Sequence, residues 1–571
     1  MSGLRVRWLG RLPYEEAWDL QRGFHEGRVQ GRTPDDYLLM VEHPPVYTLG
    51  RNGDGSNLLV TEEMLTAKGA EYHHVDRGGD ITFHGPGQLT GYPIVQLDDP
   101  KRIVPYVRTL EKALIEALRA FDIDAWTEGG LTGVWTEKGK VAAIGVRVSR
   151  QVTMHGFGLN VNTDLSWFEA MNPCGITDRT VTSISELVGR EVKLQEAVEA
   201  VTPAFTKVFG YDDVETQLAA FTRRQAKIDP SHEVDRLLAD GTFSAEKRNA
   251  EPVLVNGRLP GEPARPSWMK VSAKMDDDYL ELKKMMRGLD LHTVCEEANC
   301  PNIYECWGMG TATLMILGDT CTRACSFCNV NTGKPTEFDV MEPFRAADAI
   351  ATMNLSHAVI TSVNRDDLSD GGSGIFAQTI TESRRSSPGT DIEVLIPDFQ
   401  GDRPSLETLM AARPDVLNHN TETVLRLQRD IRTRSSYGRS LALLWRAKQL
   451  SRDGLTKSGL IVGMGETREE VLGALADLRA VGVDIITIGQ YLRPTARHRP
   501  IHRYVDPTEF DEYREFGEGL GIPHVESGPL VRSSYHAKDS TDAIKQPAMT
   551  EEGATPPEPA GITVSIGSTR R

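Results

Sequence analysis

The sequence of 571 residues has no apolar run near the roughly 18 residues that a membrane-spanning helix requires. Its start, MSGLRVRWLGRLPYEE, lacks the apolar core of a signal peptide, so we expect a cytoplasmic protein with no membrane partner. Acidic residues outnumber basic ones, and the formal net charge is −17. A nucleic-acid partner is therefore not expected, since phosphate binding needs a basic surface.

Cysteine is scarce and unevenly placed. The chain has seven cysteines, an odd number for a disulfide framework. Cys174 stands alone in the first half, and the other six fall within 34 residues: Cys295, Cys300, Cys306, Cys321, Cys325 and Cys328. In a cytosolic chain such a cluster indicates metal ligation.

The length predicts more than one domain, because 571 residues exceed what a single hydrophobic core supports. Residues 1–211 mix strand and helix patterns, with a predicted strand pair at 35–43 and 44–50 and helices at 102–121 and 192–209. These patterns favour an α+β domain with a largely antiparallel sheet.

Residues 212–265 are polar, with scattered glycine and proline, and are predicted to be a linker. A second domain is expected at 266–537, where apolar strand patterns alternate with helical ones and so predict a parallel sheet in a full or partial barrel. Its predicted strands include TLMILG, HAVITSV, IEVLIP, DVLNHN, KSGLIVGM, IITIGQY and HVESG. Residues 538–571 have the composition of a disordered tail.

Cys321, Cys325 and Cys328 form a Cx3CxxC triplet directly after a predicted strand. Three thiolates on one short loop suit three irons of a [4Fe–4S] cubane and leave the fourth iron open. Zinc favours paired CxxC or Cys/His spacings, and bacterial ferredoxins use a different spacing. The triplet, with Phe327, resembles the radical S-adenosylmethionine superfamily, in which that molecule binds the open iron and yields a 5′-deoxyadenosyl radical.

Cys295, Cys300 and Cys306 form a second triplet, which implies a second cluster because one cubane cannot use six thiolates. This triplet resembles the auxiliary-cluster motif of lipoyl synthases. The resemblance spans 266–537 and includes GDTCTRACSFCNV, VITSVNRDDLSDGG, EVLIPDFQG, TKSGLIVGMGET and GPLVRSSYHA. It implies that Ser534 is the fourth ligand of the auxiliary [4Fe–4S] cluster.

The resemblance to lipoyl synthases implies insertion of two sulfurs, at C6 and C8 of an octanoyl chain on a protein lysine. It also implies two S-adenosylmethionine molecules per product and an electron donor such as ferredoxin or flavodoxin. Ser326 and Asn329 depart from the family's CPFCD, so the local hydrogen bonding is expected to differ. Weak candidates for contacts to S-adenosylmethionine are Asn364, Glu422 and Gly463–Glu466.

Four elements of the first half occur in an order that resembles octanoyltransferases of the lipoyl pathway, which share the biotin/lipoate ligase fold. They are RGGDITFHGPG from Arg77, KVAAIGVR from Lys140, HGFGLN from His155 and NPCG around Cys174. The resemblance covers 1–211 and implies acyl-binding residues Arg77, Gly78, Gly79, Asp80, Ile81, Thr82, Phe83, His84, Ala143, Ile144, Gly145, Gly156, Phe157 and Gly158. Alanine is common in the family at 158, so glycine there is expected to loosen the acyl pocket slightly.

Cys174 and Lys140 are the predicted catalytic pair. A thiolate is an effective acyl-carrying nucleophile, and a neighbouring cation lowers its pKa. Lys140 would supply that cation and then act as a base toward the acceptor amine. His84 either orients its loop or only forms a hydrogen bond in a turn.

The two halves form a reaction sequence, since the product of the first is the substrate of the second. The expected partners are octanoyl-acyl carrier protein and, in trans, lipoyl domains of 2-oxoacid dehydrogenase E2 subunits and glycine cleavage H protein. Fusion through the linker is expected to raise the effective concentration of the second site. Three alternatives remain: an ATP-dependent lipoate or octanoate ligase in the first half, a non-enzymatic iron–sulfur electron carrier with an acyl-binding module, or a chain with one inactive half.

Overall fold

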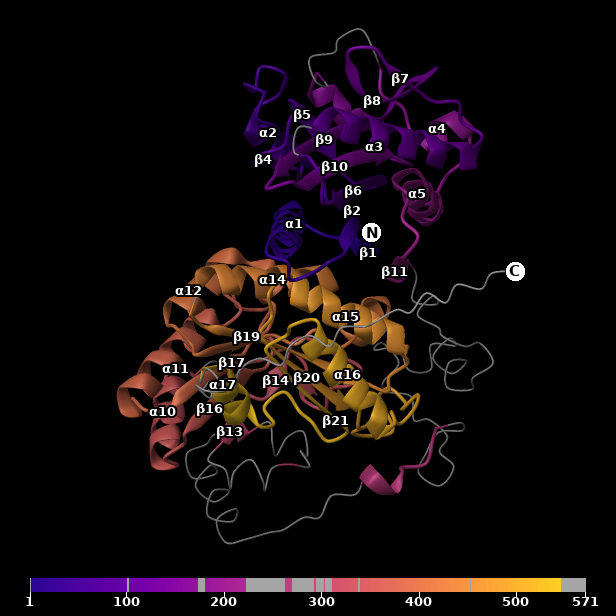
Figure 1. The fold of residues 1–571 in the computed structure, drawn as a ribbon. Coiled ribbons are helices and arrows are strands. Elements are labelled where there is room, and N and C mark those ends of the chain that lie inside the picture. Colours follow the sequence, from indigo (N-terminus) through magenta and orange to yellow (C-terminus); the bar gives the residue numbers. More distant parts are fainter. Residues whose placement is uncertain are drawn as a thin grey trace, which may run out of the picture.

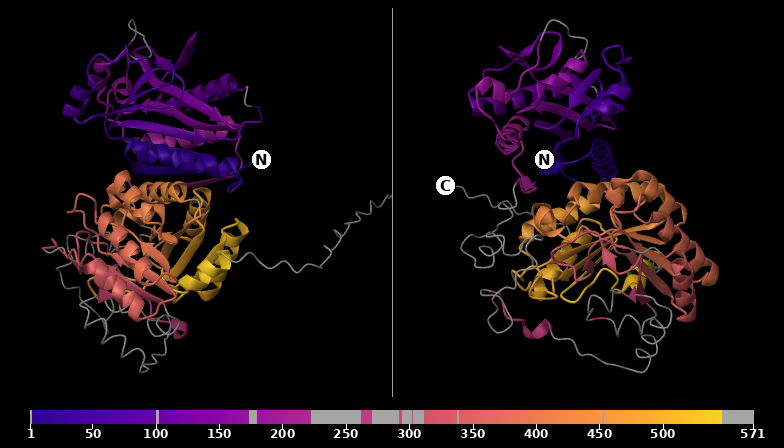
Figure 2. Two further views of the ribbon diagram at one scale, coloured as in Figure 1. Left: turned by 90° about the vertical axis from the view of Figure 1, so that its left-hand side faces the viewer. Right: turned by 180° about the vertical axis from the view of Figure 1, so that it is seen from behind.

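The computed structural model describes residues 2–99, 102–172, 180–221, 262–269, 292–293, 302, 311–336, 339–451 and 453–545. Two sheet-containing domains lie one above the other, with helix α1 (Tyr14–Val29) of the first domain between them (Figures 1 and 2). None of the helices in these ranges is both long enough and apolar enough to cross a membrane.

The first domain is built on an eight-stranded sheet of order β11-β1-β2-β6-β10-β9-β8-β7. Its strands are β1 (Leu4–Arg11), β2 (Asp36–Glu42), β6 (Gln88–Ile94), β7 (Trp126–Glu128), β8 (Leu131–Thr136), β9 (Gly139–Ser149), β10 (Val152–Asn160) and β11 (Val214–Leu218). Only β1–β2 and β1–β11 are parallel, which confirms a largely antiparallel sheet.

Alternation along β2 places side chains on both faces of this sheet. Leu38 and Met40 pack in a core that also holds side chains of α3 (Ile103–Leu118) and α5 (Leu194–Phe209). Tyr37 and Leu39 face the opposite way, into a core that they share with α1. Short helices α2 (Glu62–Ala67) and α4 (Ile184–Val188) complete the domain.

The predicted pairing of strands 35–43 and 44–50 is wrong. β3 (Val46–Leu49) leaves the main sheet and forms a separate three-stranded sheet with β4 (Glu71–His74) and β5 (Ile81–His84). Pro44 and Pro45 lie between β2 and β3, and a proline cannot donate a backbone hydrogen bond to a hairpin ladder. The second sheet carries β5 and the residues before it to the candidate acyl site.

The second domain has one eight-stranded sheet of order β12-β13-β16-β17-β18-β19-β20-β21. Apart from the antiparallel β12 (His292–Thr293), its strands are parallel: β13 (Thr311–Ile316), β16 (His357–Ser362), β17 (Asp391–Leu395), β18 (Val416–Asn418), β19 (Leu455–Val462), β20 (Ile485–Gln490) and β21 (His524–Gly528). Within the described ranges no ladder joins β21 to β12 or β13. The sheet is therefore an open, partial barrel.

Helices cover the outer face of this sheet (Figure 1). They are α10 (Glu342–Thr352), α11 (Ser373–Ser386), α12 (Arg403–Ala411), α13 (Gln428–Ile431), α14 (Tyr437–Leu450), α15 (Arg468–Ala480) and α16 (Pro507–Gly519). Each connects consecutive strands in the βα order that the alternating pattern predicts. The carboxyl ends of the strands thus gather their loops on one side, where the cysteine triplet lies.

Two predicted boundaries need correction. β11 lies inside the predicted linker and pairs in parallel with β1, because its residues continue the edge of the first sheet. α17 (Ala537–Lys545) begins where the disordered tail was predicted, and Lys545 Nζ lies 2.8 Å from Asp391 Oδ1. The proline-rich composition that suggested disorder starts only after this helix.

The two domains share a buried interface, in which α1 packs against α14 and α15. Leu20 and Phe24 of α1 belong to the same hydrophobic core as Leu441 and Val481 of the barrel. Gly27 permits the close approach, since a Cβ there would lie 2.2 Å from the carbonyl oxygen of Ala480.

Charged groups join the domains as well. Arg7 of β1 donates from Nε to Asp477 Oδ2 at 2.7 Å and from Nη2 to Oδ1 at 3.0 Å. Both side chains are almost completely buried. The linker is therefore not the only connection between the two halves.

Candidate functional site

The predicted acyl-binding segments of the first domain lie together. Gly156, Phe157 and Gly158 of β10 pair in register with Gly145, Ile144 and Ala143 of β9. The Arg77 loop packs against the same strand, where Gly78 N donates to Val146 O at 2.9 Å. The buried Arg77 guanidinium donates to Thr48 O at 2.7 Å, which holds this loop against the small sheet.

His84 ends β5 and is buried, with Nδ1 2.7 Å from Gln88 Oε1. Its ring stacks on Tyr14, the first residue of α1, with centroids 6.1 Å apart. Burial, together with neighbouring His43, lowers the pKa of His84 to about 3, so the imidazole is neutral near pH 7. His84 therefore lies at a strand end in an aromatic cluster and not in a turn.

Gly158 is closely packed rather than loose. A Cβ at this position would lie 2.8 Å from Gln88 Oε1 and 3.4 Å from His84 Nδ1. The space that alanine would fill is thus occupied by the Gln88–His84 hydrogen bond. The structure does not support the expectation of a looser acyl pocket.

Lys140 is the second residue of β9 and is buried against Trp135, with Nζ 5.4 Å from the ring centroid. Cys174 lies outside the described residues, but the residues on either side of its segment are placed. Asn172 N donates to Asn57 O at 2.9 Å, and Lys140 N donates to Thr180 O at 2.9 Å. The residue at the carboxyl end of the cysteine segment is therefore bonded to the backbone of Lys140.

Cys321, Cys325 and Cys328 lie on one loop after β13, each half-buried and free of disulfide bonds. The backbone N–H groups of Arg323 and Asn364 each donate to Cys321 Sγ at 3.4 Å. Burial raises the pKa of Cys325 to about 11 and that of Cys328 to about 12, so ligation of iron must displace their protons.

The thiol donor set fits a cluster better than a single ion. Among the described residues no three histidine, cysteine or carboxylate side chains converge on one metal position. A cubane takes each thiolate at a different iron, so its ligands need not converge on one point. Three thiols free of disulfide bonds on one loop, with two backbone N–H groups donating to Cys321 Sγ, are the donor set that such a cluster takes.

The two departures from the family pattern lie on this loop. Ser326 is buried, and its backbone N–H donates to Ile431 O at 3.0 Å. A proline at this position lacks that donor. The expected change in local hydrogen bonding is therefore present, and it attaches the loop to the end of α13.

Arg323, between the first two cysteines, anchors the loop and was not singled out from the sequence. Its guanidinium donates to both carboxylate oxygens of Asp366 at 2.8 and 2.7 Å, and to Asp398 Oδ1 at 2.6 Å. The side chain is nearly buried, so these charge-assisted bonds form away from water. The feature of the sequence that could have indicated this role is a charged residue inside the loop that carries the cysteine ligands.

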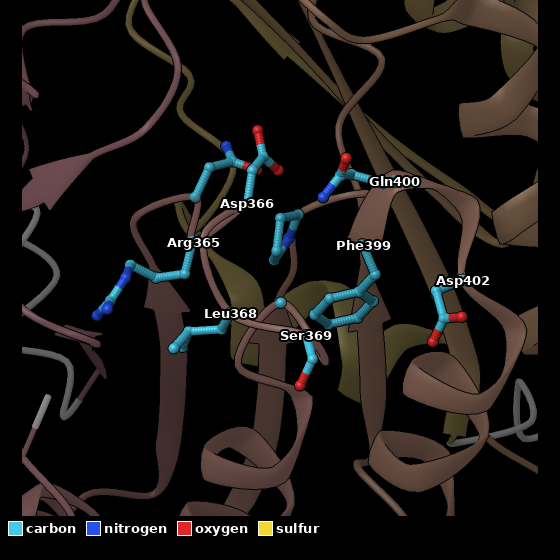
Figure 3. A pocket seen from close by; sticks show the side chains of 10 residues that line it. Arg365, Asp366, Leu368, Ser369, Phe399, Gln400 and Asp402 are labelled. Carbon is cyan, nitrogen blue, oxygen red and sulfur yellow. The ribbon is translucent and has the colours of Figure 1, made fainter. Parts of the chain in front are cut away.

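A cavity of about 220 Å³ lies beside this anchor, between the loops that follow β16 and β17 (Figure 3). Nine of its lining residues come from the two motifs that resembled lipoyl synthases, VITSVNRDDLSDGG and EVLIPDFQG, and Asp402 directly follows the second: Asn364, Arg365, Asp366, Leu368, Ser369, Gly371, Pro397, Phe399, Gln400 and Asp402. Asn364 Oδ1 is buried with no hydrogen-bond partner in the described chain. A polar atom in this state favours a bound polar ligand.

The other weak candidates for S-adenosylmethionine contacts differ in their surroundings. Glu422 is half-buried in a left-handed conformation with φ of 63°, and partial loss of hydration raises its pKa. Glu466 accepts hydrogen bonds from the backbone N–H groups of Gly463 and Met464, which indicates a structural role in its turn. Asn364 therefore remains the strongest of the three.

Cys295, Cys300 and Cys306, the predicted auxiliary ligands, lie outside the described residues. Asn302, two residues after Cys300, donates from Nδ2 to Leu530 O at 2.6 Å. Leu530 precedes half-buried Ser534 by four residues. This contact places Asn302 beside the segment that carries the predicted serine ligand.

Comparison with protein families assigns both halves. Residues 13–206 match the lipoyl protein ligase A/B catalytic domain. Residues 244–300 match the N-terminal domain of lipoyl synthase, and residues 315–478 match the radical SAM superfamily. A lipoyl synthase from Rubrobacter xylanophilus is 55% identical over 293 residues, which are 51% of this chain and 91% of the relative. The chain belongs to the lipoyl synthase family.

A second relative, a lipoyl synthase from Symbiobacterium thermophilum, is 54% identical over 290 residues and covers the same shares of the two chains. As a lipoyl synthase, the chain uses S-adenosylmethionine and two [4Fe–4S] clusters. Its first half adds a ligase/transferase catalytic domain, so the chain is an enzyme of lipoyl cofactor biosynthesis with two catalytic parts.

Part of the chain is similar to two solved ligase structures at low sequence identity. Lipoate-protein ligase A bound with ATP is 16% identical, with a TM-score of 0.31 and coverage of 43% of this chain and 94% of that chain. A bipartite lipoate protein ligase from Thermoplasma acidophilum is 17% identical, with a TM-score of 0.31 and coverage of 43% and 92%.

Proposed function

We propose that the first domain transfers an octanoyl group from acyl carrier protein to the lysine of a lipoyl domain, through a thioester on Cys174. The barrel then inserts two sulfurs into the octanoyl group on that lysine. The observation that carries the proposal is the backbone pairing of Lys140 with Thr180 and Thr182, which directly follow the cysteine segment. It supports a position for Cys174 within reach of the Lys140 amine.

The residues of the first domain have distinct tasks in this proposal. Lys140 stabilises the Cys174 thiolate and later accepts the proton of the acceptor amine. The Arg77–His84 segment and Ala143–Gly145 face the acyl chain together with Gly156–Gly158. Neutral His84 serves as a positioning group, since its bond to Gln88 fixes the end of β5.

In the second domain Cys321, Cys325 and Cys328 hold the radical-generating cluster, and Ser534 joins Cys295, Cys300 and Cys306 at the auxiliary cluster. When bound, the clusters and S-adenosylmethionine supply the carbon radical and the sulfur. Arg323 and Asn364 orient Cys321 and the loop around it. A ferredoxin or flavodoxin is the proposed electron donor.

Two matched variants test the assignment in one assay with octanoyl-acyl carrier protein and an apo lipoyl domain. Cys174→Ser should abolish octanoylation and leave sulfur insertion into a pre-octanoylated lipoyl domain intact. Cys321→Ala should do the reverse. Unchanged octanoylation by Cys174→Ser would contradict the thioester route.

The ligase alternative remains open because the matching family model covers lipoyl protein ligases A and B alike. A ligase adenylates free octanoate and needs no acyl-carrying cysteine. Octanoylation that requires ATP and free octanoate would favour it.

A further inference from the structure

We infer that Glu16, on helix α1 of the transferase domain, is a positioning residue of the radical site in the other domain. The inference rests on the proposed function of the barrel. It follows from a line of buried charged side chains that runs from α1 to the loop bearing Cys321 and Cys325.

The line of charges has three contacts. Glu16 Oε1 accepts a hydrogen bond from Arg439 Nε at 2.9 Å. Arg439 Nη1 lies 3.7 Å from Asp398 Oδ2. Asp398 Oδ1 accepts from Arg323 Nη2 at 2.6 Å, and Arg323 lies between two cluster ligands. Of the four side chains none is more than 17% exposed, so screening by solvent is weak.

Asp398 is where this line meets the cavity. Burial would raise its pKa, but the Arg323 and Arg439 guanidinium groups lower it well below the usual range, so it is ionised. Its Oδ1 also accepts from Gln400 N at 3.0 Å, and Gln400 lines the cavity. One carboxylate thus holds both the cluster loop and the cavity wall.

The cavity wall here is a strained turn. Phe399, Gln400 and Gly401 have φ values of 44°, 54° and 84°, and the first two are not glycine. Such conformations persist only where surrounding contacts hold them. Arg446 donates to Gly401 O at 3.0 Å, and Arg446 is itself bonded to Asp19 of α1.

α1 contacts both sites from the same turn. Tyr14 stacks on His84 of the acyl site, while Glu16 faces the barrel. The fused domain therefore supplies part of the outer support of the radical site and is more than a neighbour joined by a linker.

The full chain carrying Glu16→Gln tests this inference, because glutamine keeps the shape and removes the charge. The matched control is Glu26→Gln on the same helix, since Glu26 accepts from Trp445 and Gln449 at the same interface but does not contact Arg439. The affinity for S-adenosylmethionine is read from its titration of the EPR signal of the reduced cluster. Hydrogen exchange of the Gln400 and Gly401 amides is measured without that ligand.

Glu16→Gln should weaken S-adenosylmethionine binding roughly two- to thirty-fold, the range expected for a residue that acts through a network. It should also speed amide exchange at Gln400 and Gly401 and leave octanoyl transfer unchanged. Arg439→Gln should give the same result, and the double variant should be no worse than either one.

Unchanged affinity and exchange in Glu16→Gln would overturn the inference. An equal loss in Glu26→Gln would also overturn it, because general loosening of the interface would then explain both variants. A wild-type chain without a cluster signal that responds to S-adenosylmethionine would remove the proposed barrel function and this inference together. Failure of the proposed function would therefore be seen in the wild-type chain, whereas failure of this inference would be seen only in the variants.

Discussion

Lys140 is an amine placed in the interior of the first domain, 6% exposed, at the start of β9. Lysine is rarely buried unless its amine has a partner, because the charged amine loses its hydration. Its neighbour in the same hairpin, Lys138, is exposed and donates to Glu186 O at 3.0 Å. The two side chains therefore form a natural pair of test and control.

Lys140→Met should lower the rate of octanoyl transfer about 100-fold or more, the usual contribution of a positioned acid–base group. Sulfur insertion into a pre-octanoylated lipoyl domain should be unaffected. Both rates are measured by intact mass spectrometry of the lipoyl domain. Lys138→Met should behave as wild type, and an equal loss in both variants would argue against a specific role for Lys140.

At the scale of elements, strand β1 and helix α15 are joined by one buried ion pair. Asp477 accepts from Arg7 and from Tyr437 Oη at 3.0 Å. Removing its charge leaves the buried Arg7 guanidinium with the partly exposed Glu215 as its carboxylate partner. Breaking a buried pair from one side typically costs about 3–5 kcal/mol. The exposed pair of Arg468 and Glu512, on α15 and α16, is screened by solvent and contributes little to stability.

Asp477→Ala should therefore lower the free energy of unfolding by several times more than Glu512→Ala, as measured by urea denaturation. It should also separate the unfolding of the two domains into distinct transitions. Equal effects of the two variants would show that the Arg7–Asp477 pair does not hold the interface.

Most elements of both domains could be predicted from the sequence, because most barrel strands contain a short apolar run and most helices have an amphipathic period. The β3 pairing could not be predicted from the strand pattern, because β2 and the strands of the small sheet share that pattern. The two prolines before β3 are the local feature that disfavours a hairpin with β2. The approach of the Arg77 loop to β9 could be expected only through the family resemblance.

The residues of the domain interface could not be predicted, because no local sequence pattern distinguishes them from other surface residues. Glu16 and Arg439 are 423 positions apart, and each reads as an ordinary surface charge on a helix. Their pairing depends on how α1 docks on α14, which is a property of the whole fold. The sequence marks Arg323 only by its position, as a charged residue between the cluster ligands Cys321 and Cys325.

For the whole molecule, the buried interface changes what the linker is expected to do. The domains share a hydrophobic core, so cleavage between residues 222 and 261 should leave the two halves associated. They should coelute in gel filtration, and flux from octanoyl donor to lipoyl product should fall only when Asp477→Ala is added. If the two halves separated after cleavage alone, the linker would be the sole feature that raises the effective concentration of the second active site.

Stability should depend on pH through several buried imidazoles, and two of them, His43 and His84, are neighbours at the acyl site. Burial lowers the pKa of His43 to about 4, and burial with His43 nearby lowers that of His84 to about 3. In the unfolded chain both return to about 6.5 and bind protons more readily than in the folded chain. The free energy of unfolding is therefore insensitive to them above about pH 6.5.

Below that pH, each of the two histidines should reduce the free energy of unfolding by about 1.4 kcal/mol per pH unit, until its folded pKa is reached. Urea denaturation at about pH 7 and pH 5.5 measures the slope. His84→Gln should make it shallower, whereas replacement of the exposed His74 should not. A slope equal to wild type in His84→Gln would contradict the neutral, buried state of His84.

The central claim is that one chain attaches an octanoyl group to a lipoyl domain and then inserts two sulfurs into it. The direct measurement uses the anaerobically purified, iron–sulfur-reconstituted chain with octanoyl-acyl carrier protein and an apo lipoyl domain, followed by S-adenosylmethionine and reductant. Intact mass spectrometry should show an octanoyl adduct that then exchanges two hydrogens for two sulfurs. A lipoyl domain that stays unmodified until ATP and free octanoate are added would contradict the transferase. An octanoyl adduct that never gains sulfur, with both clusters present, would contradict the proposed sequence of reactions.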